Sequence, residues 1–118
     1  MPLLDSKTVT IATVQQPTAQ GQISRVEYWN PSNNTWVTTA PTVQYGQAVG
    51  VRAYGKNIGS TSQWMYLVLN IKNPSGTVKG TKQSTTLIVD PNAEIYTDLT
   101  VVSDAAGQWT ADIQLWSS

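Results

Sequence analysis

The chain contains no cysteine, no histidine and no phenylalanine, and only 12% of its 118 residues are charged. Without cysteine and histidine it has no thiolate or imidazole to bind zinc, and no Ser–His or Cys–His pair to activate a nucleophile. Seven basic and seven acidic side chains give a formal net charge of zero, whereas nucleic-acid binding needs a basic surface. These absences predict a non-enzymatic protein with no catalytic residues, no cofactor, no metal site and no nucleic-acid partner.

Long apolar runs are also missing. No stretch of 18 apolar residues could span a membrane, and the opening "MPLLDSKTVT" lacks the basic and hydrophobic regions of a signal peptide. Either the chain is not exported by that route, or a leader has been removed from it. A charge-poor surface must be covered by Thr, Ser, Asn and Gln, which is common in secreted, surface and virion proteins. We therefore expect an extracellular, cell-surface or virion location.

What the chain does contain is apolar alternation with a period of two. The residues that share one side of each central segment are Val49, Val51 and Ala53, and then Met65, Leu67, Leu69 and Ile71. Side chains that alternate in this way point to opposite faces of a β-sheet. The same pattern predicts further strands, at about 7–14, 22–29, 36–37, 87–89, 95–101 and 108–116. Residues 76–86 fit a bulged strand, an edge strand or an ordered loop.

Turn residues separate these segments, in stretches such as "NPSNN", "NPSG" and "DPNA". Seven to eight short strands with little room for helix predict an all-β fold, an antiparallel immunoglobulin-like β-sandwich that forms one domain over 1–118. The stretch "KNIGSTS" at 56–62 is predicted to connect two neighbouring antiparallel strands. The segment 7–14 precedes a polar stretch, so it is suited either to strand exchange between subunits or to pairing within its own domain.

The region 43–116 resembles a known family. The segment "YGQAVGVRAYGKNIGSTSQWMYLVLNIKNPSG" and the ending "SDAAGQWTADIQLW" are similar to immunoglobulin-like modules of prokaryotic surface proteins, of the cell-adhesion-related bacterial domain (CARDB) type. The resemblance implies a linker, stalk or adhesion unit. The 118-residue chain stands alone and starts with Met, which favours a self-assembling subunit or a virion component over a part of a multidomain protein.

Aromatic residues carry the clearest functional signal, because the chain has five Trp and five Tyr. Trp109 shares a face with apolar residues and is predicted to be in the core. Trp36 stands in a short run with little context, and packing under the "NPSNN" turn is one place for it. Five others fall on the outward side of their strands and are the predicted binding residues: Trp29, Tyr54, Trp64, Tyr66 and Trp116. Exposed rings of this kind anchor protein interfaces or stack on sugars. A one-residue error in register would instead bury them.

Carboxylates offer a weaker alternative. Glu94 and Asp98 share one side of a strand, so a hydrolase using this pair is a third hypothesis. The turns "DPNAE" and "SDAAG" could bind calcium, but they lack a regular series of acidic ligands. The first hypothesis is a non-enzymatic structural or adhesion module that binds protein partners, including copies of itself. The second is a carbohydrate-binding module that uses the exposed Trp and Tyr.

Overall fold

The computed structural model describes residues 5–7, 9 and 20–117, and among these residues it contains eight β-strands and no helix. The strands are β1 (Gly21–Asn30), β2 (Thr35–Val37), β3 (Ala48–Asn57), β4 (Gln63–Lys72), β5 (Val78–Gln83), β6 (Leu87–Val89), β7 (Glu94–Val102) and β8 (Thr110–Ser117). The described part of the chain accordingly has no helix long and apolar enough to cross a membrane.

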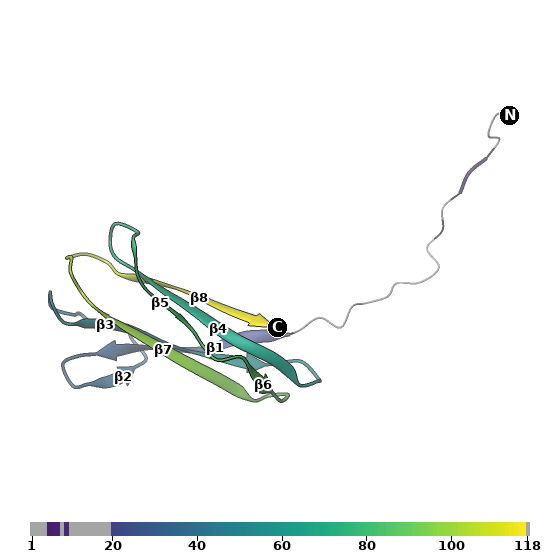
Figure 1. Cartoon of the computed structure of the whole chain (residues 1–118), viewed down its shortest axis with the longest axis horizontal. Helices are drawn as coiled ribbons and strands as arrows, with labels where there is room; N and C mark the ends of the chain where they lie inside the picture. Colours follow the sequence, from purple (N-terminus) through teal and green to yellow (C-terminus); the bar gives the residue numbers. More distant parts are fainter. Residues whose placement is uncertain (1–4, 8, 10–19, 118) are drawn as a thin grey trace.

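The strands form two antiparallel sheets. The first sheet has the order β2-β1-β3-β7. The second sheet has β4 at its centre, with β8 on one edge and β5 and β6 on the other. Figure 1 shows the long strands of both sheets following the long direction of the sandwich. The predicted all-β antiparallel sandwich of seven to eight strands is confirmed.

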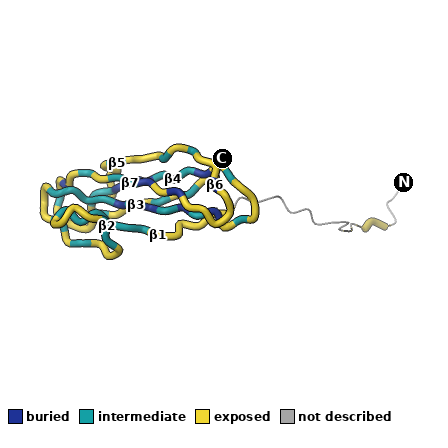
Figure 2. The backbone as a smooth tube through the Cα atoms, turned by 90° about the horizontal axis from the view of Figure 1, so that it is seen from below, coloured by how far each residue is buried: buried dark blue, intermediate teal, exposed yellow. Residues whose placement is uncertain are grey.

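The core lies between the two sheets and consists of the residues that the alternation predicts. Leu67 and Leu69 are fully buried, whereas Trp64 on the opposite side of β4 is 52% exposed. The fully or nearly buried apolar side chains are Val51, Ala53, Met65, Leu67, Leu69, Ile71, Val89 and Ile95. Most of them come from β3 and β4, and Figure 2 shows the buried segments concentrated in the middle strands. The two central strands therefore supply most of the apolar burial that stabilises the sandwich.

Residues 76–86, for which the sequence left three readings open, contain an edge strand. β5 pairs with β4 from Val68↔Gln83 to Lys72↔Val78, with a register shift between Ile71 and Lys72. The strand is almost wholly exposed. An edge strand and a bulged strand are two of the three structures that the sequence predicts for this segment. Gly76 and Gly80 lie in it, and glycine is common at bulges.

The loop after β3 differs from its prediction. β3 belongs to the first sheet and β4 to the second, so residues 58–62 cross from one layer to the other and do not join two paired neighbours. Both edges of each strand are paired with other strands: β3 lies between β1 and β7, and β4 lies between β8 and the pair β5 and β6. The prediction that 56–62 connects neighbouring paired strands is therefore wrong.

Asn57 holds this crossing together from a fully buried position. Its Nδ2 donates to the carbonyl oxygens of Thr61 and Val89, at 2.8 Å in each case. Its Oδ1 accepts from the Gly59 amide at 2.9 Å and from Nε2 of Gln63. One amide side chain thus pairs with part-buried backbone groups of the crossing loop and with the buried Val89 carbonyl of β6.

Two glycines bring the sheets close together at one end. A Cβ at Gly21 would lie 2.8 Å from Cδ2 of Leu115, and a Cβ at Gly55 would lie 2.6 Å from its Cδ1. Leu115 of the second sheet therefore packs directly on the backbones of β1 and β3. At the other end of the sandwich larger side chains, among them Tyr28 and Ile71, lie between the layers, and a cavity is present there.

The predicted exchange strand at 7–14 falls, except for Lys7 and Val9, outside the described residues.

Candidate binding surfaces

The outer face of the first sheet carries four aromatic rings in two pairs. Trp29 pairs with Trp36 across β1 and β2, with ring centroids 5.2 Å apart in an edge-to-face arrangement. Tyr54 pairs with Tyr96 across β3 and β7, with centroids 5.4 Å apart. Trp36 therefore lies in a strand on this face, and the placement under the "NPSNN" turn is wrong. The short β2 pairs in register with Trp29, so the ring is held beside the Trp29 ring.

Arginine side chains cover several of these rings. The Arg25 guanidinium carbon lies 4.0 Å from the Tyr54 ring centroid, and that of Arg52 lies 4.5 Å from Trp36 and 5.2 Å from Tyr96. Such stacking is attractive because the ring face carries negative quadrupole density. The rings of this face are thus already occupied by cations of the same chain, which leaves less ring surface for an external ligand.

Hydrogen bonds link the same groups across three strands. Nε and Nη2 of Arg52 donate to Oδ2 of Asp98 at 3.2 and 3.0 Å, and the Tyr54 hydroxyl donates to Glu27 at 2.8 Å. Burial by itself lowers the pKa of Arg52, but hydrogen bonding and attraction to Asp98, together with its interaction with Tyr54, raise that pKa above its ordinary value. The guanidinium therefore stays charged at any pH below about 12, and it adds no pH dependence to stability in that range.

We expect Arg52→Met to lower the free energy of unfolding by about 1 kcal/mol, because it removes a partly exposed ion pair and two cation–π contacts while keeping the apolar stem. Urea unfolding in low salt measures this, and 1 M NaCl should reduce the difference by screening the Asp98 pair. Arg25→Met is the matched control, since its guanidinium stacks on one ring and forms no ion pair within 4.0 Å among the described residues. A larger loss for Arg25→Met than for Arg52→Met would contradict this account.

The outer face of the second sheet carries a different kind of surface, which we call the outer-face patch. Its members are Trp64, Tyr66, Ile88 and Trp116. Trp64 pairs with Ile88 across β4 and β6, and Tyr66 pairs with Trp116 across β4 and β8. Trp64, Ile88 and Trp116 are 52%, 58% and 48% exposed, and Tyr66 is half-buried. No charged residue belongs to this cross-strand set, so the patch consists of apolar and aromatic side chains.

The five predicted binding residues therefore do not form one platform. Trp29 and Tyr54 lie on the outer face of the first sheet, and Trp64, Tyr66 and Trp116 lie on the outer face of the second. The cross-strand registers place all five on the outward sides of their strands, as predicted, and their role in binding stays a prediction. Ile88 and Tyr96 are not among the residues that the sequence predicts for binding. Both occupy outward positions in their strands, but only the pairing of β6 with β4 and of β7 with β3 places them beside the aromatic residues.

The carboxylates are engaged in contacts within the chain. Glu94 accepts a hydrogen bond from the Ser24 hydroxyl at 2.7 Å, and Asp98 is paired with Arg52. In the two candidate calcium turns, Asp90 accepts from the Ser62 hydroxyl at 2.7 Å and Asp104 pairs with Lys79 at 3.0 Å. Within the described residues, no cluster of three or more acidic side chains could hold a metal ion.

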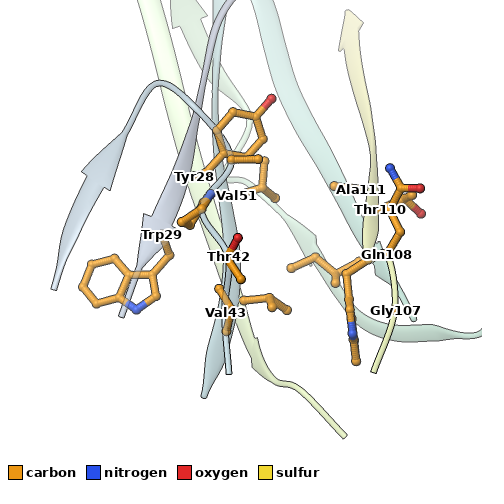
Figure 3. Close-up of a pocket in the computed structure, with 15 residues that line it drawn as sticks. Tyr28, Trp29, Thr42, Val43, Val51, Gly107, Gln108, Thr110 and Ala111 are labelled. Carbon is orange, nitrogen blue, oxygen red and sulfur yellow. The ribbon is translucent and has the colours of Figure 1, made fainter. Parts of the chain in front are cut away.

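A cavity of about 400 Å³ lies between the sheets at the end opposite the Leu115 contact. Its lining comes from β1, β3 and β4, the loop before β3, and the start of β8, and it contains no charged side chain. Figure 3 shows Tyr28 and Val51 on one side of it and Thr110 and Ala111 on the other, with the Trp29 ring turned away. Trp109 lines the cavity, packs against the core and donates from Nε1 to the Ala105 carbonyl at 3.0 Å. It is half-buried and therefore lies at the edge of the core, less deeply than predicted.

No protein-family model matches the sequence, and no curated protein is similar to it. Among solved structures, the chain is similar in fold to the C-terminal domain of wzt, with a TM-score of 0.62 and 10% sequence identity. The match covers 86% of this chain and 64% of the other, so this chain spans less than two thirds of that domain. The likeness concerns the β-sandwich fold alone.

Proposed function

We propose that the chain is a non-enzymatic structural or adhesion module of a cell surface, an extracellular filament or a virion, and that it acts through protein–protein contacts. The observation that supports this proposal is the outer-face patch. Large apolar side chains that lie together in the open are unusual on a monomer and mark surfaces that bind a partner. Trp and Tyr are also the residue types that contribute most to the energy of protein interfaces.

The two faces of the sandwich differ in a way that favours the second sheet. On the first sheet, Arg25 and Arg52 cover rings, and Asp98 neutralises Arg52. On the second sheet, none of the four patch residues carries a charge, and Trp64, Ile88 and Trp116 are exposed. Covering this patch would remove apolar surface from water without burying a charge.

We expect the chain to self-associate through this patch, and the double variant Trp64→Ala/Trp116→Ala to weaken that association at least tenfold, as loss of two central aromatic residues does at many interfaces. Sedimentation velocity between about 10 µM and 1 mM measures it. The matched control is Tyr96→Ala, which removes a ring of similar exposure from the opposite face. An equal effect of both variants, or a strict monomer at 1 mM, would contradict the proposal.

Carbohydrate binding is the second candidate function, and one feature of the same patch favours it. Nε1 of Trp116 donates to Oε1 of the exposed Gln114 at 3.1 Å, so an amide lies beside a flat ring. Sugar sites combine a ring for stacking with amides or hydroxyls for hydrogen bonds. Glycan-array binding that Trp64→Ala abolishes, in a chain that remains monomeric, would favour this function over the first.

A further inference from the structure

The strand β8 presents a long unpaired edge. It pairs with β4 along its whole length, from Lys72↔Thr110 to Met65↔Ser117. No other described strand pairs with its far side. Its backbone N–H and C=O groups on that side therefore have no strand partner in the described part of the chain. Such an edge is a template for a further strand.

The other edges of the sandwich are protected in ways that β8 is not. β5 carries two lysines and a bulge, β2 and β6 are three residues long, and β7 carries Glu94 and Asp98. The free part of β1 carries Arg25 and Glu27 and has a register shift between Ile23 and Arg25. Short strands, charges and bulges are the usual means of preventing edge-to-edge pairing. The eight residues of β8 are TADIQLWS, with no proline, no bulge in its pairing with β4, and a single charge that is neutralised by Lys72.

The core is incompletely covered on the same flank. The apolar side chains Ile113 and Leu115 of β8 are only half-buried, and Ile23 of β1 is 37% exposed, whereas Leu67 and Leu69 are fully buried. β1 pairs with β3 along one edge, but its other edge is paired only at Tyr28–Asn30, by β2, and no described strand pairs with that edge before Tyr28. Figure 2 shows the first half of β1 as exposed. The uncharged cavity lies between these two strands, so this flank has the free edge and the apolar space that an added strand needs.

The sequence contains a segment that fits this site. Residues 7–14 read KTVTIATV, in which six of eight residues are β-branched and Val9, Ile11 and Thr13 share one side. The segment has the same number of residues as β8. Val9, the described residue of its apolar side, is 62% exposed, so the chain's own sandwich does not cover that side chain.

We propose that residues 7–14 of one copy add as a strand to the free edge of β8 in a second copy, with Val9 and Ile11 directed toward the cavity flank. The proposal deepens the assembly function proposed above, but it uses a different surface. Gln20 is held on the sandwich, where its carbonyl accepts from the Ile58 amide at 3.2 Å and from Gln63 Nε2 at 3.0 Å. The donated segment would therefore leave each copy from a fixed point, and repetition of the contact would give a chain of subunits.

The first test is self-association of the full-length chain carrying Ile11→Asp. A charge on the inserted side of the strand should weaken assembly at least tenfold, measured by sedimentation velocity. Thr10→Asp is the matched control, because it places the same charge on the opposite side of the same segment and should leave assembly within twofold of the unmodified chain. Equal effects of the two variants, or no effect of either, would overturn the proposal.

The second test uses the absence of cysteine in the natural sequence. A chain carrying Ile11→Cys is mixed with chains carrying Ala111→Cys, Ile113→Cys or Leu115→Cys, and the mixture is oxidised. A disulfide between the two different copies is expected for at least one pair, and none is expected when Thr10→Cys replaces Ile11→Cys. If a cross-link forms only when both cysteines are in the same chain, the segment pairs with its own sandwich and the proposal fails.

The two assembly surfaces are separable by these variants. If Trp64→Ala/Trp116→Ala abolishes association while Ile11→Asp leaves it intact, the strand exchange is wrong and the outer-face patch stands. The opposite result would support strand addition and remove the patch as the main contact.

Discussion

Replacing Asn57 by leucine should lower the free energy of unfolding by about 3 kcal/mol or more, one of the two largest effects expected in this chain. Leucine has a similar volume, but it leaves the carbonyls of Thr61 and Val89 and the amide of Gly59 without the partners they have now. Each buried polar group left unpaired costs about 1–3 kcal/mol. Urea unfolding followed by tryptophan fluorescence measures the change.

Asn70→Leu is the control for this substitution. Asn70 lies on the outward side of β4, is half-buried and accepts one hydrogen bond, from the Thr81 hydroxyl at 2.7 Å. Its replacement should cost less than about 1 kcal/mol, because water can reach the groups that it leaves. If the two variants were equally stable, the crossing between the sheets would not depend on the Asn57 side chain.

Leu67→Ala is the second substitution with a large expected effect. Leu67 is fully buried between the sheets and packs in the cluster that contains Met65, Val89 and Ile95. Truncation removes buried methyl groups and leaves a cavity, which typically costs about 3–5 kcal/mol. Differential scanning calorimetry should show a correspondingly lower Tm.

The adjacent residue provides the comparison for that measurement. Val68→Ala changes the outward side of the same strand, where the side chain is half-buried, and it should cost less than about 1.5 kcal/mol. A cost for Val68→Ala equal to that for Leu67→Ala would show that the alternation does not separate core from surface in β4.

The side of each strand that faces the core could be predicted from the sequence, because burial imposes a period of two that the residues themselves display. In β4, every second residue from Met65 to Ile71 is buried, and the residues between them are not, as the sequence pattern predicts. The same argument identified all five aromatic residues as outward. The face to which a side chain points depends only on its place in the alternation, so a short segment is enough to predict it.

Which strands pair could not be predicted in this way. Nothing in the residues from Tyr54 to Trp64 distinguishes a hairpin from a crossing between layers, since both need a polar loop with glycine. For the same reason the sequence pattern does not show that Tyr54 and Trp64, both predicted binding residues, lie on opposite faces of the sandwich. The neighbours Ile88 and Tyr96 become visible only through pairing between strands far apart in the chain.

The crossing at residues 58–62 also shapes how this chain must fold. β3 and β4 are consecutive in the sequence, yet they belong to different sheets. β3 can pair at once with the earlier β1, but its other edge is paired only by the later β7, and β4 depends wholly on later strands. β3 pairs with β7 from Ala48 to Lys56, and β4 gains β8 only when the last residues of the described chain are in place. Contacts between segments this far apart in the sequence slow folding, because the entropy cost of closing a long loop precedes the energy gained from the contact. During synthesis on the ribosome, β4 therefore remains without its β8 partner until residues 110–117 have been made.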